Sequence, residues 1–192
     1  MSIRTKVAIG LMTAGVIFSL TACSNDENQV EHSGDTGMDH SEMDHSHMDH
    51  SSSGEVSDTL KNAESPTYEV GDKAFIEEGH MAQMNGVEVT IVGAYDTTVY
   101  AVSYNPTDGS ERVENHEWVI HEELDTVTEN PFGIGDEVLL VASHMEGMQG
   151  ASAEIDSVQQ TTVYMVDFKS ATDGSDITNH KWVTESELTS VE

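Results

Sequence analysis

Cysteine and basic residues are both scarce in this chain. Its 192 residues include one Cys, so an internal disulfide is excluded. Only 7 Lys and Arg stand against 36 Asp and Glu. Because nucleic acid and anionic lipid are bound through positive side chains, this balance argues against both as partners. The excess of carboxylates favours cations as ligands, or a soluble acidic surface with no further purpose.

Long hydrophobic runs are also lacking. The mostly apolar stretch 7–20 is too short to favour a membrane span and is typical of a secretory signal. It ends in Leu20-Thr21-Ala22-Cys23, which resembles the bacterial lipobox. The resemblance implies that the signal peptide 1–22 is removed and that Cys23 is acylated. The protein would then be lipid-anchored at the extracytoplasmic face of the cell membrane. An ordinary signal peptide with an incidental Cys is the alternative.

Catalytic motifs are a third absence. The chain has no Gly-rich phosphate loop and no Ser nucleophile elbow, and its lone Cys is assigned to the anchor. The segment 116–121 is similar to the HExxH zinc motif, but it has one residue too many and lies on an expected strand. We therefore expect a protein that is not an enzyme and has no organic cofactor.

The region that follows the signal is rich in Ser, Asp, Glu, Gly, Asn and His. It has too few apolar side chains to offset the cost of ordering a backbone, so we expect a disordered tether over residues 23–66. The triplet Met-Asp-His begins at Met38, Met43 and Met48. Imidazole binds copper and zinc, and thioether sulfur favours Cu(I). The tract therefore predicts a weak metal site, with Cu(I) or Cu(II) first and zinc second, or else it is only a polar spacer. Its candidate ligands are His40, Met43, His45, His47, Met48 and His50.

One unit occurs twice in the remainder of the chain, over residues 68–124 and 132–188. The shared landmarks include His80-Met81-x-x-Met84 with His144-Met145-x-x-Met148, and Asn115-His116-x-Trp118 with Asn179-His180-x-Trp182. Each unit ends in Glu-Leu. Such self-similarity is the signature of a repeat architecture.

Each unit reads as a series of short strands separated by turns. In the first unit, residues 73–76, 87–92, 99–104 and 112–120 carry the alternating or β-branched pattern of strands, and 121–124 reads as one helical turn. The second unit repeats this order, and no stretch has the pattern of a long amphipathic helix. We predict an all-β fold made of two tandem small β-barrels, at residues 67–125 and 131–190, that sit side by side.

These motifs together resemble the DUF1541 repeat of the YdhK-type lipoproteins of Firmicutes. The resemblance spans both units and extends to the lipobox and the His/Met tract. It implies an SH3-like β-barrel for each repeat and a function suspected to involve copper, without naming binding residues. The pair Ala82-Gln83 stands where the second unit has Glu146-Gly147, so the two loops need not have the same shape.

The two His/Met loops are the candidate sites within the repeats. One His and two Met within five residues could form a soft Cu(I) site, but Met also fills gaps in cores, which is the alternative we favour for these loops. The candidate ligands are His80, Met81, Met84, His144, Met145 and Met148. His116 and His180 are more simply read as structural, unless His80 and His116 converge on one ion.

Two functions remain open from the sequence. The first is a lipid-anchored, extracytoplasmic protein that binds or buffers copper through its tail. The second is an interaction module of the cell envelope, in which paired barrels bind a peptide, a wall polymer or a protein partner. An exposed aromatic groove would favour the second, whereas burial of Tyr100, Trp118, Tyr164 and Trp182 would count against it.

Overall fold

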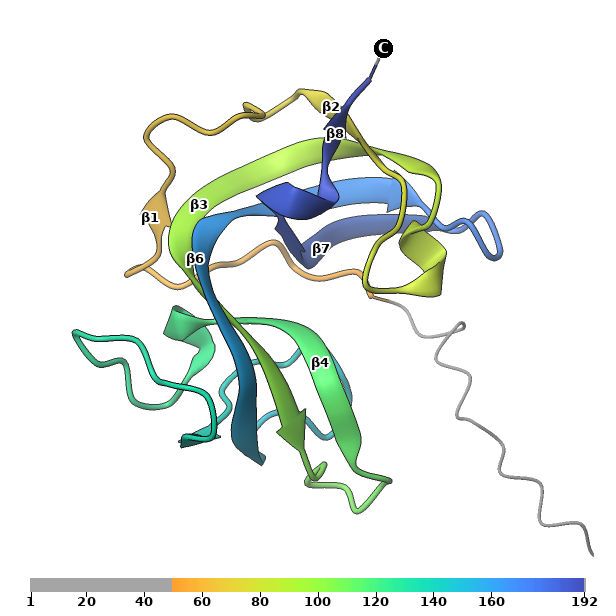
Figure 1. Ribbon diagram of the computed structural model, residues 1–192. Helices are drawn as coiled ribbons and strands as arrows, with labels where there is room; N and C mark the ends of the chain where they lie inside the picture. Colours follow the sequence, from red (N-terminus) through yellow and green to blue (C-terminus); the bar gives the residue numbers. More distant parts are fainter. Residues whose placement is uncertain (1–49, 192) are drawn as a thin grey trace, which may run out of the picture. The chain divides into compact units, whose positions relative to one another are not determined.

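The computed structural model describes residues 50–191, drawn in colour in Figure 1. Over these residues the fold is all-β, with eight strands in one antiparallel sheet and no α-helix. The prediction of an all-β protein is confirmed. Within the same residues, no helix has the length and apolar character needed to cross a membrane. The expected signal peptide, Cys23 and most of the His/Met tract lie outside the described residues.

The elements from β2 to η4 follow the order expected from the sequence pattern, and the short strands β1 and β8 were not expected. Among three short 3-10 turns, one lies before β3 and the other two directly follow β4 and β7. The strands are β1 (Lys61–Asn62), β2 (Lys73–Ile76), β3 (Val87–Tyr104), β4 (Val113–Ile120), β5 (Glu137–Leu139), β6 (Ser152–Lys169), β7 (Asp176–Thr184) and β8 (Thr189–Ser190). The 3-10 turns are η2 (Ala82–Met84), η3 (His121–Glu123) and η4 (Glu185–Glu187).

Strands β3 and β6 differ from the prediction, because each joins two expected short strands into one strand of 18 residues. The first half of β3 alternates between buried and exposed side chains, with Val87, Val89 and Ile91 facing inward. The residues 93–98 between the two expected strands hold one Gly and no Pro or Asp-Gly turn. Hydrogen bonding therefore continues through them, with a register shift between Ile91 and Gly93.

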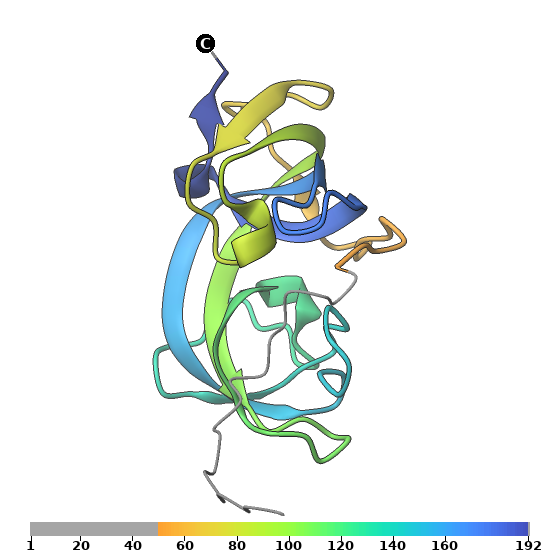
Figure 2. The ribbon, with the colours of Figure 1, turned by 90° about the vertical axis from the view of Figure 1, so that its right-hand side faces the viewer.

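The two long strands pair antiparallel along their length, from Val89 opposite Phe168 to Tyr104 opposite Ala153. Residues at equivalent repeat positions are 64 apart, as His80 and His144 show. Thr97 lies opposite its own counterpart, Thr161. The approximate twofold relation between the repeats therefore passes through the middle of this strand pair. Figure 2 shows both strands passing from the upper part of the coloured fold into its lower part.

This pairing divides the molecule into two lobes that each take half of each repeat. Lobe 1 packs β2 and the start of β3 against the end of β6 and β7. Its core contains Ile76 and Ile91 from the first repeat with Val166 and Val183 from the second. Lobe 2 packs the end of β3 and β4 against β5 and the start of β6.

The predicted arrangement of one separate barrel per repeat is therefore corrected by the packing. A barrel for residues 67–125 would bury the first half of a repeat against its own second half, and the lobes instead combine halves of different repeats. The physical reason is that β3 and β6 do not turn back in their middle, so each carries its repeat from one lobe into the other. The repeat boundaries are not the boundaries of the packed units.

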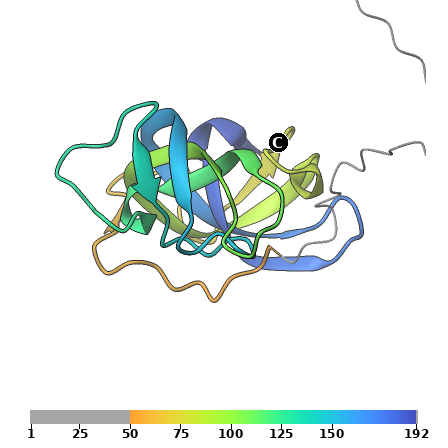
Figure 3. The ribbon, with the colours of Figure 1, turned by 90° about the horizontal axis from the view of Figure 1, so that it is seen from below.

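Residues 50–63, which we call the strap, are also placed differently from the prediction. They were expected to belong to the disordered tether. Instead β1 pairs with Tyr95 and Asp96 of β3, and Val56 and Leu60 pack against the central apolar cluster around Trp182. These few apolar side chains find a partner surface on the fold, which composition alone does not reveal. Figure 3 shows the strap, in orange, following one side of the molecule.

Candidate functional site

Each lobe brings a histidine from a loop against a histidine from a strand of the other repeat. In lobe 1, His80 precedes η2 and stacks on His180 of β7, with ring centroids 5.7 Å apart and an interplanar angle of 26°. In lobe 2, His144 lies against His116 of β4, with centroids 6.0 Å apart. We call these pairs site 1 and site 2. The ring that stacks on His80 is that of His180, which the exchange of repeat halves brings there. That His80 and His116 converge on one ion stays a prediction.

A glutamate from a 3-10 turn holds the loop histidine of each site. In site 1, Glu187 Oε1 lies 2.7 Å from His80 Nδ1, and its Oε2 accepts a 3.0 Å bond from Trp118 Nε1. In site 2, Glu123 Oε1 lies 2.8 Å from His144 Nε2. Its Oε2 accepts a 3.0 Å bond from Trp182 Nε1. Each Trp comes from the strand of the opposite lobe, so these bonds tie the two lobes together.

The local environment keeps both glutamates ionised. Burial acts to raise the pKa of Glu187, but hydrogen bonds from His80 and Thr184 outweigh it and lower the pKa to about 2. Burial likewise acts to raise the pKa of Glu123, and His144 and Trp182 overcome it, so this pKa lies below its ordinary value. A carboxylate can only accept, so each loop histidine donates its bonded N–H to its glutamate.

This bond decides which nitrogen of each loop histidine is left for another ligand. When His80 is neutral and donates through Nδ1, its Nε2 carries the lone pair. When His144 donates through Nε2, its Nδ1 carries the lone pair, and that atom is buried without a hydrogen-bond partner among the described residues. A carboxylate that fixes the tautomer and direction of an imidazole is the usual outer support of a metal-binding histidine.

His180 is the most unusual polar side chain of the two sites. It is 3% exposed, and neither of its ring nitrogens makes a hydrogen bond of standard geometry with another described residue. Burial lowers the pKa of His180 well below 6.5, and His80, His50 and His144 lower it further, while the backbone of His50 acts in the opposite direction. The ring is therefore neutral near pH 7. A buried polar group without such bonds costs stability, so its presence calls for a functional reason.

The four methionines of the predicted loop sites divide into two pairs. Met84 and Met148 are fully buried and belong to the cores of lobe 1 and lobe 2. Met81 and Met145 are partly buried and lie at the edges of those cores, with Tyr104 Oη 3.8 Å from Met145 Sδ. The outer methionine of each loop is thus the one that a bound ion could reach.

His50 is the member of the tail tract that the structure describes. Its ring lies edge-on to His180, with centroids 6.1 Å apart, so the end of the tract meets site 1. The other tract candidates lie outside the described residues: His40, Met43, His45, His47 and Met48.

The donor types at these sites fit a copper or zinc ion better than a hard cation. Neutral imidazole nitrogens and a thioether suit Cu(I), and imidazole with carboxylate suits Cu(II) or Zn(II). The side chains are not already grouped around one point, since no cluster of three or more His, Cys, Asp or Glu within residues 50–191 has the spacing of a metal site. Binding at site 1 or site 2 would therefore require side-chain movement or a further ligand.

Sequence reasoning missed the two glutamates and treated the two strand histidines as structural. Glu123 and Glu187 were visible only as the shared Glu-Leu ending of the repeats. The recurrence of His116 and His180 before a Trp was also visible, but nothing near them in sequence supplied a second ligand. The partner of each histidine lies in the other repeat, at a distance along the chain that no local motif spans.

Two lobes that share halves of a duplicated unit, each with a carboxylate-supported histidine pair, define a class of all-β repeat protein. The chain belongs to the family described as "Protein of unknown function (DUF1541)", whose profile matches residues 70–121 and 134–185. It is 47% identical to "Uncharacterized protein YdhK" of Bacillus subtilis (strain 168) over 184 residues, which is 96% of this chain and 89% of that protein.

Solved structures of that relative carry the same fold. A crystal structure of the Bacillus subtilis ydhK protein aligns with a TM-score of 0.73 and 52% identity, covering 77% of this chain and 100% of that chain. A solution NMR structure of the ydhK C-terminal domain aligns with a TM-score of 0.61 and 54% identity, covering 64% of this chain and 93% of that one.

Proposed function

We propose that this protein is a lipid-anchored, extracytoplasmic copper-binding protein that holds or buffers copper at the cell surface. Copper would be bound by the Met-Asp-His tract and by sites 1 and 2. The observation that carries the proposal is the pair of carboxylate-supported histidines, His80 and His144. Each faces a second histidine, and in site 1 that partner is buried without standard hydrogen bonds. Two such arrangements in one small fold are costly unless they bind something.

The chemistry of the donors supports copper over other cations. His180 is neutral near pH 7, so its ring offers a lone pair without first losing a proton. Met81 and Met145 follow the loop histidines directly in sequence and supply soft sulfur at the edge of each core. Copper also heads the affinity order of divalent ions for such ligands. A bound ion would be held by His80 and His144, whose rings the glutamates already keep in a fixed orientation.

The alternative of an interaction module has less support. Tyr100, Tyr164 and Trp182 are all buried, and Trp118 is partly buried with its indole N–H bonded to Glu187. These aromatic side chains therefore do not form the exposed groove that would favour a peptide or a wall polymer.

The proposal is tested by titrating the purified protein with Cu(I), Cu(II) and Zn(II) in a calorimeter. Three chains are compared: the native sequence, a chain whose tract His and Met residues up to Met48 are Ser, and the variant His80→Leu/His144→Leu. We expect the Ser chain to keep copper at the folded sites, and the double variant to keep only the tract's weaker binding. Affinity of the native chain no better than that of a scrambled acidic peptide would end the proposal.

The cellular part of the proposal needs its own measurement. We expect Cys23→Ser to release the protein from the membrane fraction, and loss of the protein to lower the copper tolerance of the strain. A membrane-bound Cys23→Ser protein would contradict the anchor. Unchanged copper tolerance would contradict the role at the cell surface.

A further inference from the structure

The strap binds along the edge of β7 next to site 1. Ser52 N–H donates to the carbonyl of Thr178 at 3.0 Å, and Ser52 Oγ donates to the carbonyl of Asn179 at 2.6 Å. Asn179 Nδ2 returns a 3.3 Å bond to the carbonyl of Ser52. Lys181 Nζ donates to the carbonyl of Glu55. These bonds fix the backbone two residues after His50, so the position of His50 beside His180 follows from a built contact.

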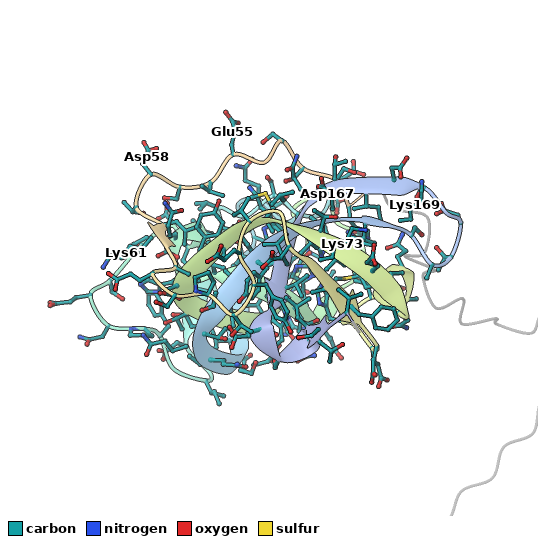
Figure 4. All side chains as sticks on the ribbon, turned by 90° about the horizontal axis from the view of Figure 1, so that it is seen from above. Glu55, Asp58, Lys61, Lys73, Asp167 and Lys169 are labelled. Carbon is teal, nitrogen blue, oxygen red and sulfur yellow. The ribbon has the colours of Figure 1, made fainter. Side chains whose placement is uncertain are left out.

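The strap presents its charged side chains outward and its apolar ones inward. Glu55 and Asp58 are exposed and point away from the fold in Figure 4, while Val56 and Leu60 pack against the central cluster. Gly54 has a φ of +77°, and a Cβ there would lie 3.1 Å from the side chain of Asn179. The strap is therefore shaped to lie close on this part of β7.

Lobe 2 cannot have a strap of this kind, because of the chain's connectivity. The residues 64 positions after the strap, 114–127, include most of β4 and all of η3, which are integral parts of the first repeat. Asn115, the counterpart of Asn179, turns its amide to Glu117 on its own strand. The strap thus breaks the twofold relation, and within residues 50–191 only site 1 receives a third imidazole from outside the repeats.

Building on the proposed function, we infer that site 1 is where an ion held by the Met-Asp-His tract enters the folded protein, with the imidazole of His50 as the shared ligand. His50 directly follows Met48-Asp49, so it is at once the last residue of the tract and a neighbour of His180. Its ring is only half-buried and can turn to meet an ion at His180. Transfer is a ligand exchange with no change in oxidation state, and direct linkage gives a local ligand concentration on the order of millimolar.

This inference predicts that the two sites differ in affinity and in order of filling. Cu(I) is added stepwise and without oxygen to the purified protein, and histidine ring resonances are followed by NMR. We expect the rings of His80 and His180 to respond before those of His116 and His144. In His50→Gln the affinity of site 1 should fall by about tenfold or more, because loss of a ligand costs at least as much as loss of an outer-shell support, while site 2 is unchanged.

Two further variants separate the role of His50 from other effects of the tail. His32→Gln removes a tail histidine that lies outside the Met-Asp-His tract and should leave site 1 unchanged. Ser52→Pro keeps His50 but removes the bonds that Ser52 makes to β7, so site 1 should weaken as in His50→Gln. A dispersed amide spectrum checks that each variant is folded.

The possible failures are distinguishable. Equal filling of the two sites, or equal effects of His50→Gln and His32→Gln, would overturn the inference and leave copper binding itself standing. Absence of any response at His80, His180, His116 and His144 would overturn the folded sites of the proposed function and this inference together.

Discussion

His180 is a side chain whose position costs the fold stability. It is buried, and its ring nitrogens have no standard hydrogen bonds, whereas His121 uses both ring nitrogens, toward Tyr100 Oη at 2.8 Å and the carbonyl of Thr128 at 2.9 Å. His180 therefore has the environment of a binding histidine, and His121 has that of a structural histidine. Their contrast gives a matched pair for experiments.

Metal-free protein should lose stability as the solution is acidified below about pH 6.5. Below this value the unfolded chain binds a proton at His180, but the folded chain does not until its much lower pKa is reached. The free energy of unfolding therefore rises with pH across this window. The pKa of Glu187 is lowered from 4.5 to about 2, so Glu187 adds a second loss of stability as the pH falls from about 4.5 to about 2. Urea unfolding at a series of pH values measures both.

The variant His180→Leu is the control for the first window. Its unfolding free energy at pH 7 should be unchanged or about 1 kcal/mol higher than that of the native chain, because an unsatisfied polar ring is replaced by an apolar side chain. The decrease in the free energy of unfolding just below pH 6.5 should be smaller in this variant than in the native chain. His121→Leu should instead destabilise by about 1–2 kcal/mol. Equal destabilisation by the two variants would show that His180 is a structural histidine.

At the scale of elements, the loops that carry His80 and His144 reach the same contact by different backbones. The first forms η2, and the carbonyl of Gln83 accepts a 2.8 Å bond from Ala171 N–H. The second uses Gly147 at the position of Gln83, with a φ of +74°, and its carbonyl accepts a 2.8 Å bond from Thr107 N–H. The sequence difference between the loops thus changes their shape and keeps their anchoring to the other repeat.

Replacement of Gly147 by Ala should be more damaging than replacement of Gly86. Both glycines have positive φ, but a Cβ on Gly147 would lie 2.8 Å from Pro106 Cβ, whereas a Cβ on Gly86 would meet nothing within 4 Å. We expect Gly86→Ala to cost about 1 kcal/mol from backbone strain alone and Gly147→Ala to cost clearly more. Chemical denaturation of both variants measures the difference. Equal losses would mean that the loop relaxes away from Pro106.

At the scale of the whole molecule, the exchange of halves makes the two repeats one cooperative unit. Each core draws on both repeats, and the bonds from Trp118 to Glu187 and from Trp182 to Glu123 join the lobes. Unfolding of either repeat would therefore remove half of the core of both lobes. Two independent barrels would lack this coupling.

We therefore expect a single unfolding transition that core substitutions in either lobe shift alike. Ile91 and Ile155 are counterparts, 0% and 1% exposed, in lobe 1 and lobe 2. Ile91→Ala and Ile155→Ala should each lower the free energy of unfolding by about 2–5 kcal/mol. Urea unfolding followed by tryptophan fluorescence and by circular dichroism should give coincident curves. Glu154→Ala, on the exposed face beside Ile155, is the control and should change stability by less than about 0.5 kcal/mol. Two transitions, with only one shifted in each variant, would contradict the coupling.

The sequence by itself determined the repeat, the all-β character and the position of most strands, because alternation of apolar residues and turn residues such as Asp173-Gly174 act locally. It also singled out His80 and His144 as candidate ligands. It did not reveal the strap or the roles of Glu123 and Glu187. Only the tertiary structure decided that each half of a repeat packs against a half of the other repeat. The two repeats offer interchangeable apolar faces, so the local pattern cannot distinguish a half from its counterpart 64 residues away. The continuous pairing of β3 with β6 through both lobes makes that choice, and with it brings His80 to His180.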